Sequence, residues 1–153
     1  IKEVTGPGGN LLYQGTQSTN QVFSAEVMAD TTYALQQVTQ SGTGAAASIG
    51  MNRPVAGKTG TTEDNASAWF SGYTPQLATS VAMFRDDATQ TLNGIGGLNS
   101  VTGGTFPAKI WTAFMKGALA NQPVLNFPAP VHIGGTDPVV MTSGGKQTMK
   151  KKK

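Results

Sequence analysis

The feature that most constrains the fold is a pair of predicted strands joined by only three residues. We expect strands over 54–61, 68–73 and 77–84, with Pro54 at the first position of the first strand, where its missing N–H is tolerated. Thr74-Pro75-Gln76 separates the second from the third. A connection this short joins antiparallel neighbours and cannot accommodate a crossover between parallel strands. The chain is therefore expected to fold around an antiparallel sheet, with Trp69, Phe70 and Tyr73 packing in the sheet and core.

Two helices are predicted on either side of these strands in the sequence. Ser24 is placed to cap a helix over 25–39, and Pro107 suits the first turn of a helix over 106–120. Residues at three- and four-residue spacings give each helix one face expected to be buried. These faces are Met28, Thr32, Leu35 and Val38 in the first helix, and Ile110, Trp111, Phe114 and Met115 in the second.

The remaining segments are predicted to be connections. Residues 1–4 and 11–14 flank a turn rich in Gly, Pro and Asn and are typical of a hairpin. Residues 86–105 contain five glycines and little periodicity, which indicates a long surface loop. Prolines interrupt the sequence after residue 121. We therefore expect a folded part over 1–120 and a disordered tail over 121–153.

The positive charge of the chain is concentrated in that tail. The net charge is +3, but five of the 11 basic residues lie in the last eight positions, which leaves residues 1–145 with a net charge of −2. A basic tail on a slightly acidic domain gives little support to nucleic-acid binding, and no nucleic acid is expected as a partner. No apolar run approaches the roughly 18 residues of a membrane-spanning helix. The single histidine, His132, has no metal-binding neighbours at ligand spacing, and there is no cysteine, so neither a metal nor another cofactor is expected.

The most specific stretch of the sequence is Ala-Gly-Lys-Thr-Gly-Thr-Thr, residues 56–62. Along a strand, Thr59 and Thr61 alternate with Lys58 and Gly60, so both hydroxyls point to one face. Lys58-Thr59-Gly60 has the form of the third signature of the penicillin-recognising serine acyltransferases. With residues 68–75 (Ala-Trp-Phe-Ser-Gly-Tyr-Thr-Pro), 40–44 and 104–111, it closely resembles the transpeptidase domain of the class A, bifunctional penicillin-binding proteins.

The resemblance implies a fold and a set of roles. The fold is α/β, a central antiparallel sheet with helices on both faces, of which this chain contributes only the C-terminal portion. Thr59 and Thr61 would bind the carboxylate of a D-alanyl-D-alanine stem peptide, and Gly60 would let the substrate backbone lie against the strand. The N–H of Thr61 would be an oxyanion donor. Lys58 would supply positive charge, and β-lactam antibiotics would acylate the complete enzyme.

Two motifs of that family are missing at the expected places. The nucleophile of the family lies in Ser-x-x-Lys, and its second motif is Ser-x-Asn. The forms found here, Ser143–Lys146 in the glycine-rich tail and Ser18–Asn20 in a polar loop, are interpreted as chance matches. Because Ile1 is not an initiator methionine, we expect the chain to begin partway through a longer protein. The N-terminal portion of that protein, present as a separate chain, would supply both motifs and bury the exposed edge of the sheet that contains strand 54–61.

The resemblance also implies properties of the complete protein. It would carry a glycosyltransferase domain and a membrane anchor upstream, and it would act at the extracytoplasmic face of the bacterial cell membrane. Two alternatives remain open at this point. A serine β-lactamase-like hydrolase shares the third signature, and a non-catalytic module could bind anionic wall polymer or membrane through the lysine tail. A nucleotide-binding P-loop is disfavoured, because Asn52 stands where its first glycine is needed.

Overall fold

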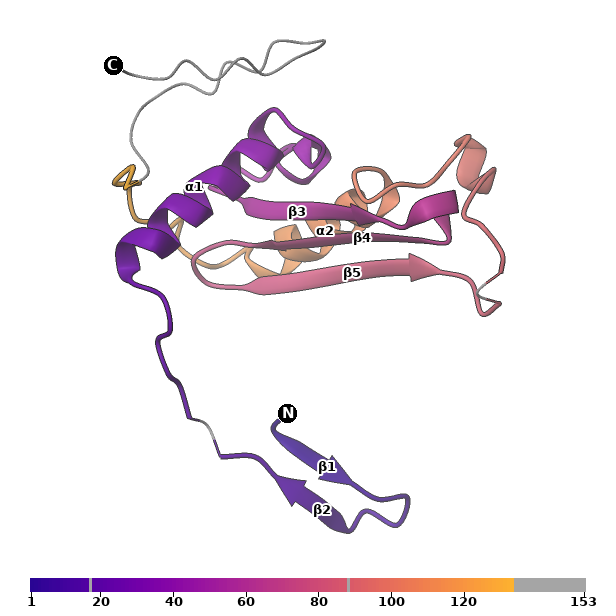
Figure 1. The fold of residues 1–153 in the computed structure, drawn as a ribbon, viewed down its shortest axis with the longest axis horizontal. Helices are drawn as coiled ribbons and strands as arrows, with labels where there is room; N and C mark the ends of the chain where they lie inside the picture. The colour runs from indigo at the N-terminus through magenta and orange to yellow at the C-terminus, as the bar shows by residue number, and fades with distance from the viewer. Residues whose placement is uncertain (17, 88, 134–153) are drawn as a thin grey trace, which may run out of the picture.

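A three-stranded antiparallel sheet lies at the centre of the computed structural model, which describes residues 1–16, 18–87 and 89–133. Its strands are β3 (Ala56–Thr61), β4 (Ser67–Tyr73) and β5 (Ala78–Phe84), in the order β3-β4-β5 (Figure 1). All three predicted strands are confirmed, although β3 begins two residues after Pro54. Both strand pairs are antiparallel, and the short connection between β4 and β5 required this of the second pair.

Both predicted helices form close to their expected bounds, as α1 (Ala25–Gln40) and α2 (Phe106–Ala118). The Ser24 hydroxyl caps α1 by accepting a hydrogen bond from the N–H of Val27 at 3.4 Å. Pro107 lies in the first turn of α2, where no intrahelical N–H is needed. The two helices begin where local capping signals place them.

The helices cover opposite faces of the sheet. Successive side chains of β4 alternate between its faces. The Tyr73 hydroxyl lies 2.9 Å from that of Thr32 on α1, whereas Phe70, three positions away on the opposite face, packs against Trp111 of α2. Figure 1 shows α1 in front of the sheet and α2 behind it. The predicted architecture, a sheet with helices on both faces, is confirmed.

The main core lies between the sheet and α2, with the Trp111 indole at its centre. That side chain has no exposed surface, and its Nε1–H donates to the carbonyl oxygens of Gly72 at 3.3 Å and Thr79 at 3.0 Å. The ring of Phe70 lies edge-on to it, with centroids 5.3 Å apart. The core cluster consists of Ala47, Met51, Val55, Phe70, Ala108, Trp111, Met115 and Leu119.

Glycines make room for the Phe70 ring. A Cβ at Gly57 would lie 2.8 Å from a ring atom of Phe70, and one at Gly72 would lie 2.7 Å away. Any side chain at these positions would therefore displace the ring. Gly57, next to Lys58, is thus explained by packing within the sheet.

The predicted set of buried side chains was partly wrong, in both helices and at one position of β4. Four apolar side chains expected to pack are exposed, namely Met28 (46%), Trp69 (44%), Ile110 (48%) and Phe114 (53%). On α2 the buried side chains are Pro107, Ala108, Trp111, Thr112 and Met115. Ile110 and Phe114 each precede a member of this set by one position, which turns them away from the sheet. On α1 the buried residues are Ala29, Thr32 and Thr39, because small and polar side chains make its contact with the sheet.

The described part of 86–105 forms no long helix or strand and lies largely at the surface, as predicted, but two of its apolar side chains are buried. Leu92 is 2% exposed and Val101 is fully buried, and both join Ala68 of β4 in a second, smaller core. The backbone between them forms a bridge from Asn93 to Ser100 and a short 3₁₀ turn, η3 (Ile95–Gly97). Leu92 and Val101 thus hold this segment against the sheet, although no regular spacing of apolar residues around them indicated that they would be buried.

The predicted N-terminal hairpin is confirmed as β1 (Glu3–Thr5) and β2 (Leu11–Gln14). Figure 1 shows it apart from the rest of the molecule, at the end of an extended segment. Its large apolar side chains, Val4, Leu11, Leu12 and Tyr13, are at least 40% exposed.

The first part of the predicted tail, residues 121–133, contacts the folded domain and is here called the strap. It forms no helix or strand, as its prolines predicted, but the expectation of disorder is wrong for this stretch. The Arg53 guanidinium donates to the carbonyl oxygens of Leu119 and Gln122 at 3.0 and 3.2 Å. Further along, Phe127 lies edge-on to Tyr73 at 5.4 Å. Residues 134–153 lie outside the described residues.

The Asp30 carboxylate of α1 holds the end of the strap. It accepts hydrogen bonds from the N–H groups of Val131 (2.7 Å), His132 (2.9 Å) and Ile133 (2.8 Å). These bonds, the one from His132 first, lower the pKa of Asp30 below its ordinary value. A lowered carboxyl pKa means that the attachment is fully present above the ordinary pKa and is lost as the pH falls through the lowered one.

Asp30→Asn is therefore expected to loosen residues 131–133 at neutral pH, because an uncharged amide has one acceptor oxygen in place of two and cannot hold all three N–H groups as the carboxylate does. Amide hydrogen exchange at these residues should be slow in the wild type at pH 7, should lose protection as the pH falls below about 4, and should be faster in the variant than in the wild type at pH 7. Asp87→Asn is the matched control, since the pKa of the Asp87 carboxyl is likewise lowered by hydrogen bonds, here from Thr89. Equal protection of residues 131–133 in wild type and Asp30→Asn would contradict the assignment.

Among the residues that the structure describes, neither helix combines the length and the apolar character that crossing a bilayer requires.

Candidate functional site

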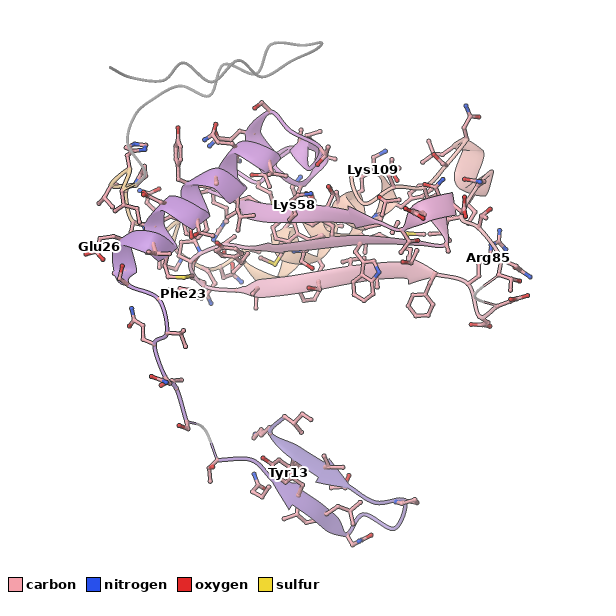
Figure 2. All side chains as sticks on the ribbon, in the orientation of Figure 1. Tyr13, Phe23, Glu26, Lys58, Arg85 and Lys109 are labelled. Atoms are coloured by element: carbon pink, nitrogen blue, oxygen red, sulfur yellow. The ribbon has the colours of Figure 1, made fainter. Side chains whose placement is uncertain are left out.

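The predicted site residues lie in β3, at one edge of the sheet (Figure 2). Each residue of an antiparallel pair shares its face with the partner opposite it. Thr59 pairs with Phe70 and therefore faces the α2 side, whereas Lys58 pairs with Ser71 and starts on the α1 side. The alternation predicted from the sequence is present, so the hydroxyls and the lysine leave the strand on opposite faces.

The Lys58 side chain nevertheless turns back to the edge of the strand. Its ammonium nitrogen donates to the carbonyl oxygen of Thr59 at 2.9 Å and lies 3.5 Å from the Thr59 hydroxyl oxygen. The side chain is exposed. Positive charge is thus held beside the Thr59 hydroxyl, in a position that a ligand can reach.

A third residue, which the sequence did not single out as functional, completes this group. The hydroxyl oxygens of Thr43 and Thr59 lie 2.7 Å apart. Thr43 belongs to the loop after α1, within the stretch 40–44 that carried part of the family resemblance. That stretch was the available signal, but nothing in its spacing indicated that it would meet β3. Lys58, Thr59 and Thr43 are called the hydroxyl cluster below.

Thr61 is held by a different loop. Its hydroxyl oxygen accepts a hydrogen bond from the N–H of Gly103 at 3.2 Å. Gly103 is pressed against the strand, since a Cβ there would lie 2.8 Å from the Gly60 carbonyl oxygen. Thr59 and Thr61 therefore share a face of the strand but have separate hydrogen-bond partners.

The N–H group of Thr61 points away from the neighbouring strand β4. The N–H of Thr62 donates to the carbonyl oxygen of Ser67 at 3.0 Å and so points toward β4. Because successive N–H groups along a strand point to opposite edges, the N–H of Thr61 points to the outer edge of β3. That edge also carries the hydroxyl cluster, so donors and positive charge gather along it.

A pocket of about 360 Å³ opens beside Lys58, on the side of α1. Small residues and a few larger side chains line it: Leu35, Gly57, Lys58, Ser71, Gly72, Tyr73, Ala78, Thr79 and Ser80. Within the described residues it contains no histidine or carboxylate that could act as a base. The Ser71 and Ser80 hydroxyls bond to each other at 2.8 Å.

Ser18, one of the two serines interpreted as chance matches to family motifs, is not brought to this site. Ser18 lies in the extended segment between the hairpin and α1, and Figure 2 shows Tyr13 on that hairpin far from Lys58. Ser143 lies outside the described residues. No cluster of metal-binding side chains occurs among residues 1–16, 18–87 and 89–133.

The sequence matches the family described as the penicillin binding protein transpeptidase domain over residues 2–96. Penicillin-binding protein 1A of Mycolicibacterium smegmatis is 32% identical over 142 residues, covering 88% of this chain and 18% of that protein. Penicillin-binding protein 1B of Vibrio cholerae is 29% identical over 146 residues, covering 95% of this chain and 18% of that protein. The chain thus spans about a fifth of the length of these relatives.

Solved structures show the same fold. The penicillin-binding protein PonA1 from Mycobacterium tuberculosis superposes with a TM-score of 0.70 at 29% identity, covering 95% of this chain and 39% of that one. Its complex with penicillin V gives a TM-score of 0.66 at 30% identity, over 88% of this chain and 36% of that one. The predicted fold class is therefore confirmed.

Proposed function

Since this chain belongs to the transpeptidase-domain family of the penicillin-binding proteins, with class A members among its relatives, we propose that it supplies the third-signature strand of a peptidoglycan D,D-transpeptidase. The complete enzyme would cross-link stem peptides through an acyl-enzyme and would be acylated by β-lactams. The observation that carries the proposal is the hydroxyl cluster, in which an ammonium group and two hydroxyls converge on one strand edge.

The chemistry of that edge fits a substrate that ends in a carboxylate. The Lys58 ammonium attracts an anion, and the Thr59 hydroxyl beside it can donate to a carboxylate oxygen. In the transition state of acyl transfer, negative charge develops on the carbonyl oxygen of the scissile bond. The outward N–H of Thr61 would donate to that oxygen, an interaction worth about 2.7–4 kcal/mol in enzymes that use it.

The nucleophilic serine must come from outside this chain. The proposed source is the N-terminal portion of the same protein, carrying the Ser-x-x-Lys and Ser-x-Asn motifs as a separate chain. Two features of the described residues support such a partner. The outer edge of β5 has no neighbouring strand, and the pocket beside Lys58 lacks a catalytic base.

The contacts at the two edges of the sheet favour one position for that partner. Thr43 reaches the edge of β3, and the hydroxyl cluster occupies that edge. The edge of β5 is free in the described residues. We propose that the strands of the partner add to β5, which leaves the edge of β3 for substrate.

The remaining properties of the complete protein are also proposals. The relatives named penicillin-binding protein 1A and 1B are about five times as long as this chain, which leaves room for the glycosyltransferase domain and the membrane anchor expected upstream. Action at the extracytoplasmic face of the bacterial membrane follows from the substrate, since peptidoglycan is assembled there.

Labelling with a fluorescent penicillin, resolved on a denaturing gel, tests the proposal. The chain is prepared together with the N-terminal portion of its protein. Label is expected on the companion band, with this chain unlabelled. Label on this chain would mean that Ser18 or Ser143 had been misjudged. Label that forms and is rapidly released would favour the β-lactamase-like alternative. The absence of label on both chains would favour a non-catalytic module. Salt-dependent binding to anionic vesicles through residues 146–153 would support that alternative.

Thr59→Val tests the carboxylate contact within the same preparation. Valine keeps the shape of threonine but removes the hydroxyl, so a hydrogen bond to a charged group is lost. The second-order rate constant of acylation by a carboxylate-bearing β-lactam should fall about 10- to 100-fold. The free energy of unfolding should change by no more than about 1–2 kcal/mol. An unchanged acylation rate would remove Thr59 from the site.

A further inference from the structure

In the contact between Thr43 and Thr59, one hydroxyl donates the hydrogen bond and the other accepts it. The two hydroxyl oxygens lie 2.7 Å apart, which is the usual length of an O–H···O hydrogen bond, and either could donate. Each threonine hydroxyl has one hydrogen and can accept two hydrogen bonds. If Thr59 gave its hydrogen to Thr43, it would present only lone pairs to a ligand and would repel a carboxylate.

The surroundings of Thr59 favour the opposite arrangement. The Lys58 ammonium, 3.5 Å from the Thr59 hydroxyl oxygen, can only donate, so this oxygen is already next to a donor. A second donor, Thr43, fills its other lone pair and leaves the Thr59 hydrogen free. A hydroxyl that accepts two hydrogen bonds is also polarised and becomes a stronger donor itself.

We infer that Thr43 is a positioning residue, whose hydroxyl donates to Thr59 and thereby directs the Thr59 hydrogen toward the carboxylate of the substrate. The inference rests on the proposed function and adds to it a residue outside the third-signature strand. In this arrangement Thr43 acts only through Thr59 and does not contact the substrate.

The fold holds Thr43 firmly enough for this role. The loop ends α1 with two backbone hydrogen bonds, from Ser41 to Gln37 and from Gly44 to Val38, both 3.1 Å long. Gly44 packs against Phe70, since a Cβ there would lie 3.1 Å from its ring. On the other side, Gly104 is in close contact with the carbonyl oxygen of Thr43. The end of α1, the core and the loop that contains Gly104 therefore fix the position from which this hydroxyl donates.

The test compares Thr43→Val with Thr43→Ser in the transpeptidase assembled from this chain and the N-terminal portion of its protein. Acylation by a penicillin should slow about 10-fold in Thr43→Val, the loss expected for one hydrogen bond. It should stay within about threefold of wild type in Thr43→Ser, which keeps the donor. The methyl ester of the same penicillin lacks the carboxylate, so its slower acylation should be equal in all three proteins. A purely structural role for Thr43 would slow both ligands alike.

Thr31→Val is the matched control, because Thr31 is an exposed threonine whose hydroxyl bonds only to the Val27 carbonyl of its own helix, at 2.8 Å. It should leave acylation unchanged. In the double variant, Thr43→Val should add nothing to Thr59→Val, since the first acts only through the second. If Thr59→Val slows acylation and Thr43→Val does not, the inference is wrong and the proposed function stands. If the wild-type assembly is not acylated at all, both are wrong.

Discussion

Replacing Trp111 by alanine is expected to lower the free energy of unfolding by about 3–5 kcal/mol, the range for removing a large buried aromatic side chain. The indole has no exposed surface and fills the space between α2 and the sheet. Neighbouring backbone cannot close the gap, because Phe70 and Gly72 are fixed in β4 by pairing on both sides. A loss of this size is a large part of the 5–15 kcal/mol that stabilises an ordinary domain.

Trp111→Phe separates the packing of this ring from its hydrogen bond. Phenylalanine keeps an aromatic contact with Phe70 but loses the N–H that donates to Gly72 and Thr79. The expected loss is about 1–3 kcal/mol, from one donor and a smaller ring. Ile110→Ala, one position away but 48% exposed, should cost less than about 1 kcal/mol. Urea unfolding followed by circular dichroism measures all three in the protein that carries this chain. Equal losses for Trp111→Ala and Ile110→Ala would contradict the packing described.

The parts of the fold that could be predicted depend on neighbours in the sequence. The turn at residues 74–76 required antiparallel strands. Ser24 marked the start of α1, because its hydroxyl bonds to the N–H of Val27, only three residues further along the chain. The alternation of Lys58 with Thr59 is likewise a property of any strand. Such features need no knowledge of what packs against the element.

The parts that could not be predicted depend on contacts distant in the sequence. Thr43 meets Thr59 across 16 residues, and Asp30 meets the strap across 101 to 103 residues. Neither contact has a periodic signature in the sequence.

The buried face of α2 was predicted wrongly for a related reason. Hydrophobicity favoured Ile110 and Phe114, but the buried face includes the small Ala108 and the polar Thr112, whose hydroxyl bonds to the carbonyl oxygens of Ala108 and Ala47.

Removing the Lys58 ammonium is expected to have the largest effect of any substitution proposed here on the rate of acylation. In Lys58→Ala, acylation of the assembled transpeptidase by a penicillin should slow about 10²- to 10³-fold, the cost of losing one preorganised electrostatic group from an active site. The ammonium lies at the edge of β3, bonded to the Thr59 carbonyl oxygen, which is the proposed position of the substrate carboxylate. Because the side chain is exposed, the free energy of unfolding should change by less than about 0.5 kcal/mol.

The dependence on salt distinguishes charge from packing. Attraction between Lys58 and an approaching carboxylate is screened as ionic strength rises, so wild-type acylation should slow with added salt while that of Lys58→Ala stays flat. Lys58→Arg keeps the charge but replaces a compact ammonium by a planar fork that does not fit the same contact with Thr59. It should recover the salt dependence and only part of the rate. Salt dependence that persists undiminished in Lys58→Ala would mean that the attraction arises elsewhere on the surface, and that Lys58 is an exposed strand residue without a role in binding the carboxylate.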